Sequence, residues 1–138
     1  MAAAITSLQN PRVKAAAKLR DRRGREKQQR IIIDGLREIS RAAAAGLSWS
    51  EVFVGEEASE NDDFSQLVDA LRKAGAEIIP VGENVLAKIA FGERNEGVVA
   101  IASAPKRTLE SIELSASPVV AVLEQIEKPG NIGAVLRT

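Results

Sequence analysis

Residues 31–46, IIIDGLREISRAAAAG, decide the fold of this chain. Three consecutive isoleucines favour a strand, because β-branched side chains pack well on a pleated sheet. Leu36, Ile39 and Ala43 then recur at helical spacing, and Gly46 is suited to end that helix. This short strand followed by a helix predicts one β-α unit.

The same alternation continues along the chain. The further expected elements are a strand at 52–54, a helix from Asp62 or Asp63 to Gly75, a strand at 78–79, a helix at 84–90 and, after the polar loop 92–97, a strand at 98–102. Strands that alternate with helices predict a mostly parallel sheet with helices on both faces. We therefore expect one α/β domain over residues 1–103.

The composition changes after this domain. Residues 104–118 mix Ser, Ala, Pro and charges without periodicity, which is typical of a linker. The apolar run 119–123 then predicts a strand buried on both faces, and Asn131 can cap a short helix. One strand and two helical turns cannot bury a core of their own. Residues 119–138 are thus expected either to begin a second, incomplete domain or to pack on the first.

Composition excludes several classes of protein. The chain has 138 residues, of which 45% are hydrophobic, and this is typical of a globular protein. It has no apolar run long enough to cross a membrane and no signal-peptide core at the front, so we expect a cytoplasmic protein without membrane partners. It has no Cys and no His, which argues against disulfides, thiolate nucleophiles, most zinc sites and the usual general base for chemistry near neutral pH, and we expect no metal site.

The net charge of zero conceals an asymmetry along the chain. Residues 1–41 hold eleven Lys/Arg against four Asp/Glu, whereas residues 42–138 hold eight against fifteen. Nine cations fall within nineteen residues: Arg12, Lys14, Lys18, Arg20, Arg22, Arg23, Arg25, Lys27 and Arg30. Charge runs often form ordinary solvated faces, but this imbalance favours a polyanion partner, and we take the nine as RNA-binding candidates.

The local structure of this basic segment can also be predicted. Asn10 and Pro11 form a strong helix start, and the helix is expected to reach about Arg20. Residues 21–29 contain no large apolar side chain, which predicts an exposed loop or a frayed helical extension.

A motif near the end of the chain identifies a family. Residues 123–138 resemble the first motif of SpoU-type RNA 2'-O-ribose methyltransferases, of the TrmH type within the SPOUT superfamily. Its hallmark residues follow a buried strand and stand here as Pro129, Asn131, Gly133 and Arg137. The front of the chain resembles that family's N-terminal extension, in its basic Asn-Pro helix, its strand ending in Asp34 and Gly35, and the stretch 95–100.

This resemblance implies a fold and an activity. It implies a three-layer α/β/α, ribosomal-protein-like RNA-binding domain, followed by the truncated start of a knotted α/β methyltransferase domain. The implied reaction is methyl transfer from S-adenosylmethionine to a ribose 2'-oxygen, with ribosomal RNA as the expected substrate and rRNA processing as the expected role. It also implies a homodimer for the full-length protein, whereas most of the methyl donor's pocket is expected beyond residue 138, so that this chain alone would be inactive.

The resemblance points to Asn131 and Arg137 as catalytic candidates. A guanidinium is a poor general base, so a better role for Arg137 is a two-pronged grip on the phosphate beside the target ribose, which would stabilise the developing alkoxide. The alternatives are an ordinary solvated arginine and, for Asn131, a simple helix cap. At the level of the whole protein, the alternative to an enzyme is an RNA- or ribosome-binding module of the same fold without chemistry of its own.

Overall fold

The computed structural model describes residues 3–55, 62–91 and 96–138. They belong to two compact units, Met1–Lys106 and Arg107–Thr138. The first unit contains, in chain order, α1 (Pro11–Lys18), α2 (Arg22–Gln28), β1 (Arg30–Asp34), α3 (Leu36–Ala44), β2 (Trp49–Gly55), α4 (Asp62–Lys73), β3 (Glu77–Val81), α5 (Glu83–Ile89) and β4 (Val98–Ser103). The predicted strands and helices of residues 1–103 are confirmed, each within a few residues of its expected bounds.

The four strands form one sheet in the order β1-β4-β2-β3. Only β2 and β3 are parallel, and β4 runs antiparallel to both of its neighbours. The prediction of a mostly parallel sheet is therefore wrong. The physical reason is that β4, the last strand, inserts between β1 and β2 instead of joining the edge, and local periodicity does not reveal such a long-range pairing.

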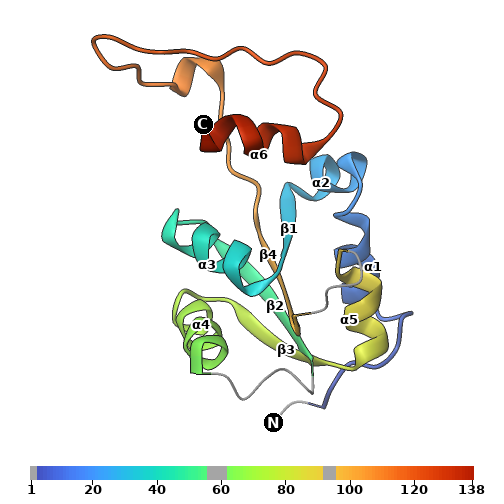
Figure 1. Ribbon diagram of the computed structural model, residues 1–138. Coiled ribbons are helices and arrows are strands. Elements are labelled where there is room, and N and C mark those ends of the chain that lie inside the picture. The colour runs from blue at the N-terminus through green and yellow to red at the C-terminus, as the bar shows by residue number, and fades with distance from the viewer. Residues whose placement is uncertain (1–2, 56–61, 92–95) are drawn as a thin grey trace. The chain divides into compact units, whose positions relative to one another are not determined.

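Helices cover both faces of this sheet (Figure 1). On one face α1 and α5 pack over Phe53, Val99 and Ile101, and on the other α3 and α4 pack over Val52 and Ala100. Neighbouring residues of β2 and β4 thus face opposite cores, as the pleat of a strand requires. The predicted three-layer α/β/α architecture is confirmed.

The outer edge of β3 is covered by the start of the chain. The amide of Ile5 donates to the carbonyl of Pro80 at 2.9 Å, and the amide of Gly82 donates to the carbonyl of Ile5 at 3.0 Å. Because Pro80 has no amide hydrogen, it could not donate to a further strand at this edge. Ile5 and Pro80 together block the outer edge of β3 at the end of this strand.

The second unit contains a single turn of 3-10 helix, η1 (Leu109–Ser111), and one α-helix, α6 (Pro129–Arg137). The strand predicted at 119–123 is absent from these described residues, and all five of its side chains are exposed. A buried strand needs partners on both sides, and the described part of the chain provides none for it. Among the described residues, no helix is long and apolar enough to cross a membrane.

Candidate nucleic-acid interface

Helix α1 carries the first part of the basic segment. The side chain of Asn10 accepts a backbone amide of the first turn at 2.9 Å, which confirms the predicted helix start. Val13 and Ala16 are buried against the sheet. Lys14 and Lys18, one turn apart, are exposed, so this helix presents two cations on the same side.

Helix α2 has no apolar side chain that could bury it, and polar contacts hold it against α1 instead. Arg25 donates through Nη1 to two carbonyls just after α1, at 3.0 and 2.8 Å, and Gln28 donates to the carbonyl of Ala15 at 2.9 Å. Gly24 lies so close to α1 that a Cβ atom there would be 1.8 Å from the carbonyl oxygen of Lys18. The segment predicted as a loop or helical extension is therefore a helix fixed to its neighbour.

Two of the nine RNA-binding candidates take part in an internal ion-pair cluster. The carboxylate of Glu51 in β2 accepts hydrogen bonds from Arg12 Nε at 2.7 Å and from Arg30 Nη1 at 2.8 Å. Arg12 also forms an ion pair with Glu77 of β3. The side chain of Glu51 is only 13% exposed. The hydrogen bond to Glu77 raises the pKa of Arg12 and holds the pKa of Glu77 below its usual value. These contacts connect α1 with three strands of the sheet.

The other candidates lie mainly at the surface. Arg25 contacts the carbonyls that fix α2, and Arg22 is exposed and pairs with Glu26 at 2.6 Å. Four exposed cations have no side-chain hydrogen bond or ion pair within the described part of the chain: Lys14, Lys18, Arg23 and Lys27. Arg23 and Lys27 are one turn apart on α2, as Lys14 and Lys18 are on α1. We call these four side chains the basic corner.

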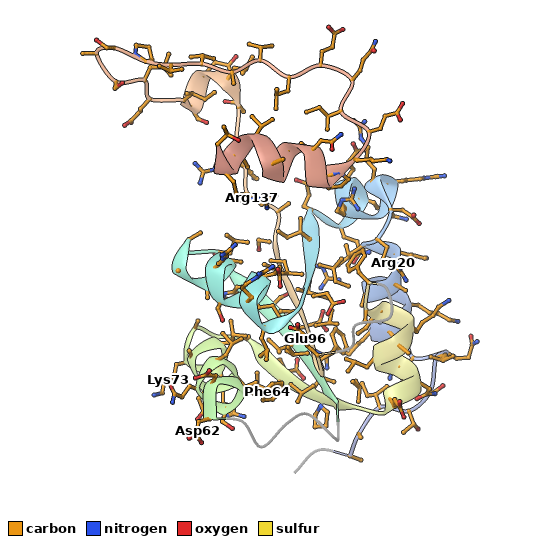
Figure 2. The ribbon with its side chains drawn as sticks, viewed as in Figure 1. Arg20, Asp62, Phe64, Lys73, Glu96 and Arg137 are labelled. Carbon is orange, nitrogen blue, oxygen red and sulfur yellow. The ribbon has the colours of Figure 1, made fainter. Side chains whose placement is uncertain are left out.

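Arg20 continues this basic surface toward α5 (Figure 2). Its guanidinium carbon lies 5.0 Å from the centroid of the Phe91 ring, which is cation–π distance. Phe91 was not predicted as a functional residue, and the sequence gives little signal for it, since Arg20 and Phe91 are 71 residues apart.

A cavity of about 590 Å³ lies beside Phe91. Two carboxylates in its wall accept backbone amides from the facing segment. Asp34 Oδ2 accepts the amide of Phe91 at 2.6 Å, and Glu96 Oε2 accepts the amide of Leu36 at 2.7 Å. Burial raises the pKa of Asp34, and the charge of Glu96 adds to this effect, whereas the amides of Phe91 and Gly35 oppose it. The rest of the predicted polar loop, residues 92–95, lies outside the described residues.

Helix α6 carries both catalytic candidates. It begins at Pro129, with Lys128 as its cap, so the reading of Asn131 as the helix cap is wrong. Proline favours the first position of a helix, and this starts α6 three residues earlier than predicted, with the cap at Lys128 instead of Asn131. Arg137 is the last residue of α6, and six residues of helix place it about 9 Å along the axis from Asn131. Within the described residues the two side chains are not brought together.

The sheet with its covering helices, together with the basic corner, defines an α/β domain that can present a cationic surface to a polyanion. Residues 10–100 match the MRM3-like substrate binding domain, and the chain belongs to this family.

Similar proteins agree with this assignment. The chain is 32% identical over 139 residues to an uncharacterised tRNA/rRNA methyltransferase of Synechocystis, a match that covers 99% of this chain and 48% of the relative. A crystal structure of an RNA 2'-O ribose methyltransferase has 39% identity and a TM-score of 0.80, over 98% of this chain and 50% of that one. The SpoU methyltransferase AviRb of Streptomyces viridochromogenes, solved with AdoMet, shares the fold at 21% identity, with a TM-score of 0.69 over 78% of this chain and 40% of that one.

The predicted resemblance to SpoU-type RNA methyltransferases is thereby confirmed. The chain spans about half the length of the relatives that match almost all of it.

Proposed function

We propose that this chain is the RNA-binding portion of an S-adenosylmethionine-dependent RNA 2'-O-ribose methyltransferase, with ribosomal RNA as its substrate. The observation that carries the proposal is the basic corner on a domain of the MRM3-like substrate binding family. Its four cations are not neutralised by carboxylates of the described residues, so they are available to phosphates.

The fixed position of α2 supports this role. Polar contacts from Arg25 and Gln28 and the close approach of Gly24 hold the helix against α1 before any ligand binds. Two cations on each helix are therefore presented at a set spacing. A surface that is already arranged loses less conformational entropy on binding than a flexible basic tail does.

We assign a different role to three of the nine basic candidates. Arg12 and Arg30 pair with Glu51, and Arg25 fixes α2 to α1. In this proposal they support the surface, whereas Lys14, Lys18, Arg23 and Lys27, with Arg20 and Arg22 beside them, contact the RNA backbone.

Measurement of RNA affinity against salt tests this division. Removing one cation that binds a phosphate lowers the slope of log K against log salt by roughly 0.7 to 0.9. The double variant Arg23→Gln/Lys27→Gln should therefore lower the slope by about 1.4 to 1.8. The matched control, Lys73→Gln/Lys106→Gln, makes the same charge change on exposed side chains outside the segment 12–30 and should keep the wild-type slope. Equal slopes in the two double variants would refute the assignment of the RNA surface.

The catalytic part of the proposal rests on α6. In this proposal Arg137 grips the phosphate next to the target ribose and stabilises negative charge on the 2'-oxygen, and Asn131 lies beside the same ribose. In the described residues 107–138, all side chains except Ile126 are exposed, so these residues do not enclose S-adenosylmethionine by themselves. We propose that the rest of the protein forms the pocket for the methyl donor.

A second candidate is a non-catalytic RNA- or ribosome-binding module. It is favoured by one observation, namely that the first unit contains both hydrophobic cores, whereas the unit that carries Asn131 and Arg137 contains neither. Transfer of labelled methyl groups to ribosomal RNA by the whole protein separates the two candidates. If the protein is an enzyme, the whole wild-type protein should transfer methyl groups to ribosomal RNA. The variant Arg137→Ala should lose this transfer, while RNA binding by the first unit persists. RNA binding without transfer, even by the whole protein, would favour the module. We also propose that the protein is cytoplasmic and that the full-length protein forms a homodimer.

A further inference from the structure

Phe91 stands apart from the other aromatic residues of the chain. All four aromatic residues are described by the structure, and Trp49, Phe53 and Phe64 are buried, whereas Phe91 is 43% exposed. Arg20 lies over its ring, with the guanidinium carbon 5.0 Å from the centroid. The guanidinium covers one face of the ring, so a nucleobase can stack only on the opposite face of this partly exposed side chain.

Three of the eight residues that line the cavity next to this ring carry a carboxylate. Its charged lining consists of Asp34, Glu38, Glu96 and Arg37, and Arg37 already pairs with Glu38 at 3.0 Å. The cavity volume of about 590 Å³ lies in the usual range for ligand pockets. The carboxylates outnumber the single arginine and disfavour a phosphate, whereas a ligand that offers hydrogen-bond donors fits this lining.

The two carboxylates nearest to Phe91 are held in place by the backbone. Asp34 uses Oδ2 to accept the Phe91 amide, and its Oδ1 is buried without a hydrogen-bond partner among the described residues. Glu96 accepts the Leu36 amide. Gly35 lies between them with φ of 97°, where a Cβ atom would be 3.2 Å from Glu96 Oε2. Because Oδ1 is buried from solvent, a ligand in the cavity would meet Asp34 through Oδ2, which can accept a second hydrogen bond.

We propose that this cavity holds one unpaired nucleobase of the RNA, stacked on the face of the Phe91 ring opposite Arg20 and donating N–H groups to Asp34 and Glu96. The inference rests on the proposed RNA-binding function and goes beyond it, because it adds a base-specific contact to the phosphate contacts of the basic corner. Guanine fits best, because its edge presents two adjacent donors, N1–H and the N2 amino group. The edges of uracil and adenine place acceptors next to their donors, and these would face the carboxylates.

The first test compares Phe91→Leu with wild type, using a labelled unstructured twelve-nucleotide RNA that contains one guanine. Leucine keeps the apolar bulk but removes the stacking face, so affinity should fall about tenfold or more, while the salt slope stays unchanged. A blunt RNA duplex, which offers no unpaired base, should bind both proteins equally. Leu8→Ala is the matched control, since Leu8 is similarly exposed, at 40%, and it should bind as wild type does. Thermal unfolding of each variant shows that it is folded.

The second test addresses the hydrogen bonds. Replacing the single guanine by inosine removes the N2 amino group, and the wild type should bind the inosine RNA several times more weakly. In Asp34→Asn this preference should shrink toward none. Equal binding of the two RNAs by wild type, or unchanged single-strand affinity in Phe91→Leu, would overturn the proposed base site. A different result would show that the proposed RNA-binding function itself is wrong. In that case the wild type would bind none of these RNAs with a salt slope that depends on Arg23 and Lys27.

Discussion

The ion-pair cluster around Glu51 gives the sharpest prediction about stability. In Glu51→Gln the side chain keeps its shape, but it no longer carries the charge that binds Arg12 Nε and Arg30 Nη1, at 2.7 and 2.8 Å. A hydrogen bond to a charged group contributes about 1.5 to 3 kcal/mol when it is buried. The two arginines are 36% and 28% exposed, so solvent screening reduces this contribution. Discounting each bond to about 1 kcal/mol gives roughly 2 kcal/mol for the substitution.

Urea unfolding followed by Trp49 fluorescence measures this destabilisation. Trp49 is the single tryptophan and is 8% exposed, so it reports on the sheet that Glu51 joins. A destabilisation of about 2 kcal/mol corresponds to a fall in Tm of roughly 8 to 16 °C for a domain of about 100 residues. Glu113→Gln, which makes the same charge change at an exposed site, should unfold as wild type does. A Glu51→Gln protein within about 0.5 kcal/mol of wild type would show that Arg12 and Arg30 do not support the fold.

Two further substitutions test how α2 and the cavity are built. Gly24→Ala should lower the free energy of unfolding by about 1 to 3 kcal/mol in urea titrations, because the new methyl group meets the Lys18 carbonyl. Helix propensity alone predicts the opposite sign, so a stabilised variant would contradict the close contact. Asp34→Asn should raise Tm at pH 7, since burial raises the pKa of Asp34 in the folded state and ionisation there opposes folding. Between about pH 3.9, the value in the unfolded chain, and the raised pKa of the folded state, the folded wild type binds more protons than the unfolded chain. Its stability therefore falls as the pH rises through this window. The advantage of Asn should therefore disappear at pH values below that window, and a constant advantage at every pH would rule out this explanation.

Local patterns were sufficient to predict the elements of the first unit. The isoleucines at 31–33, the apolar spacing of the next helix and the cap at Asn10 all act within a few residues of one another. Burial at these positions follows the predicted periods, because each element has one face that must leave water.

The order of the strands and the residues around the cavity could not be predicted in this way. Strand β4 pairs with β1 across about seventy residues, and Glu96 accepts an amide 60 residues away in the sequence. Such pairings depend on how the whole chain closes, which composition and periodicity do not record. Helix α2 was predicted only as an exposed loop or a frayed helical extension for a related reason, because contacts between Arg25 and backbone carbonyls hold it, and it has no apolar stripe.

The run at 119–123 shows the limit of an apolar pattern. Valine and leucine there predict a central strand, but a strand forms only where neighbouring strands accept its hydrogen bonds. Asn131 and Arg137 could be selected only through the family motif, since their helix alone looks like any short surface helix.

The covered edge of β3 affects how molecules of this protein meet at high concentration. An open strand edge offers a row of amides and carbonyls on which another copy can assemble, and this is a common route to aggregation. The amide of Ile5 donates a hydrogen bond to the carbonyl of Pro80, and Pro80 has no amide hydrogen that a further strand could accept. We therefore expect the short segment before α1 to hinder the addition of another strand at the end of β3, although it carries no catalytic candidate and none of the nine basic side chains.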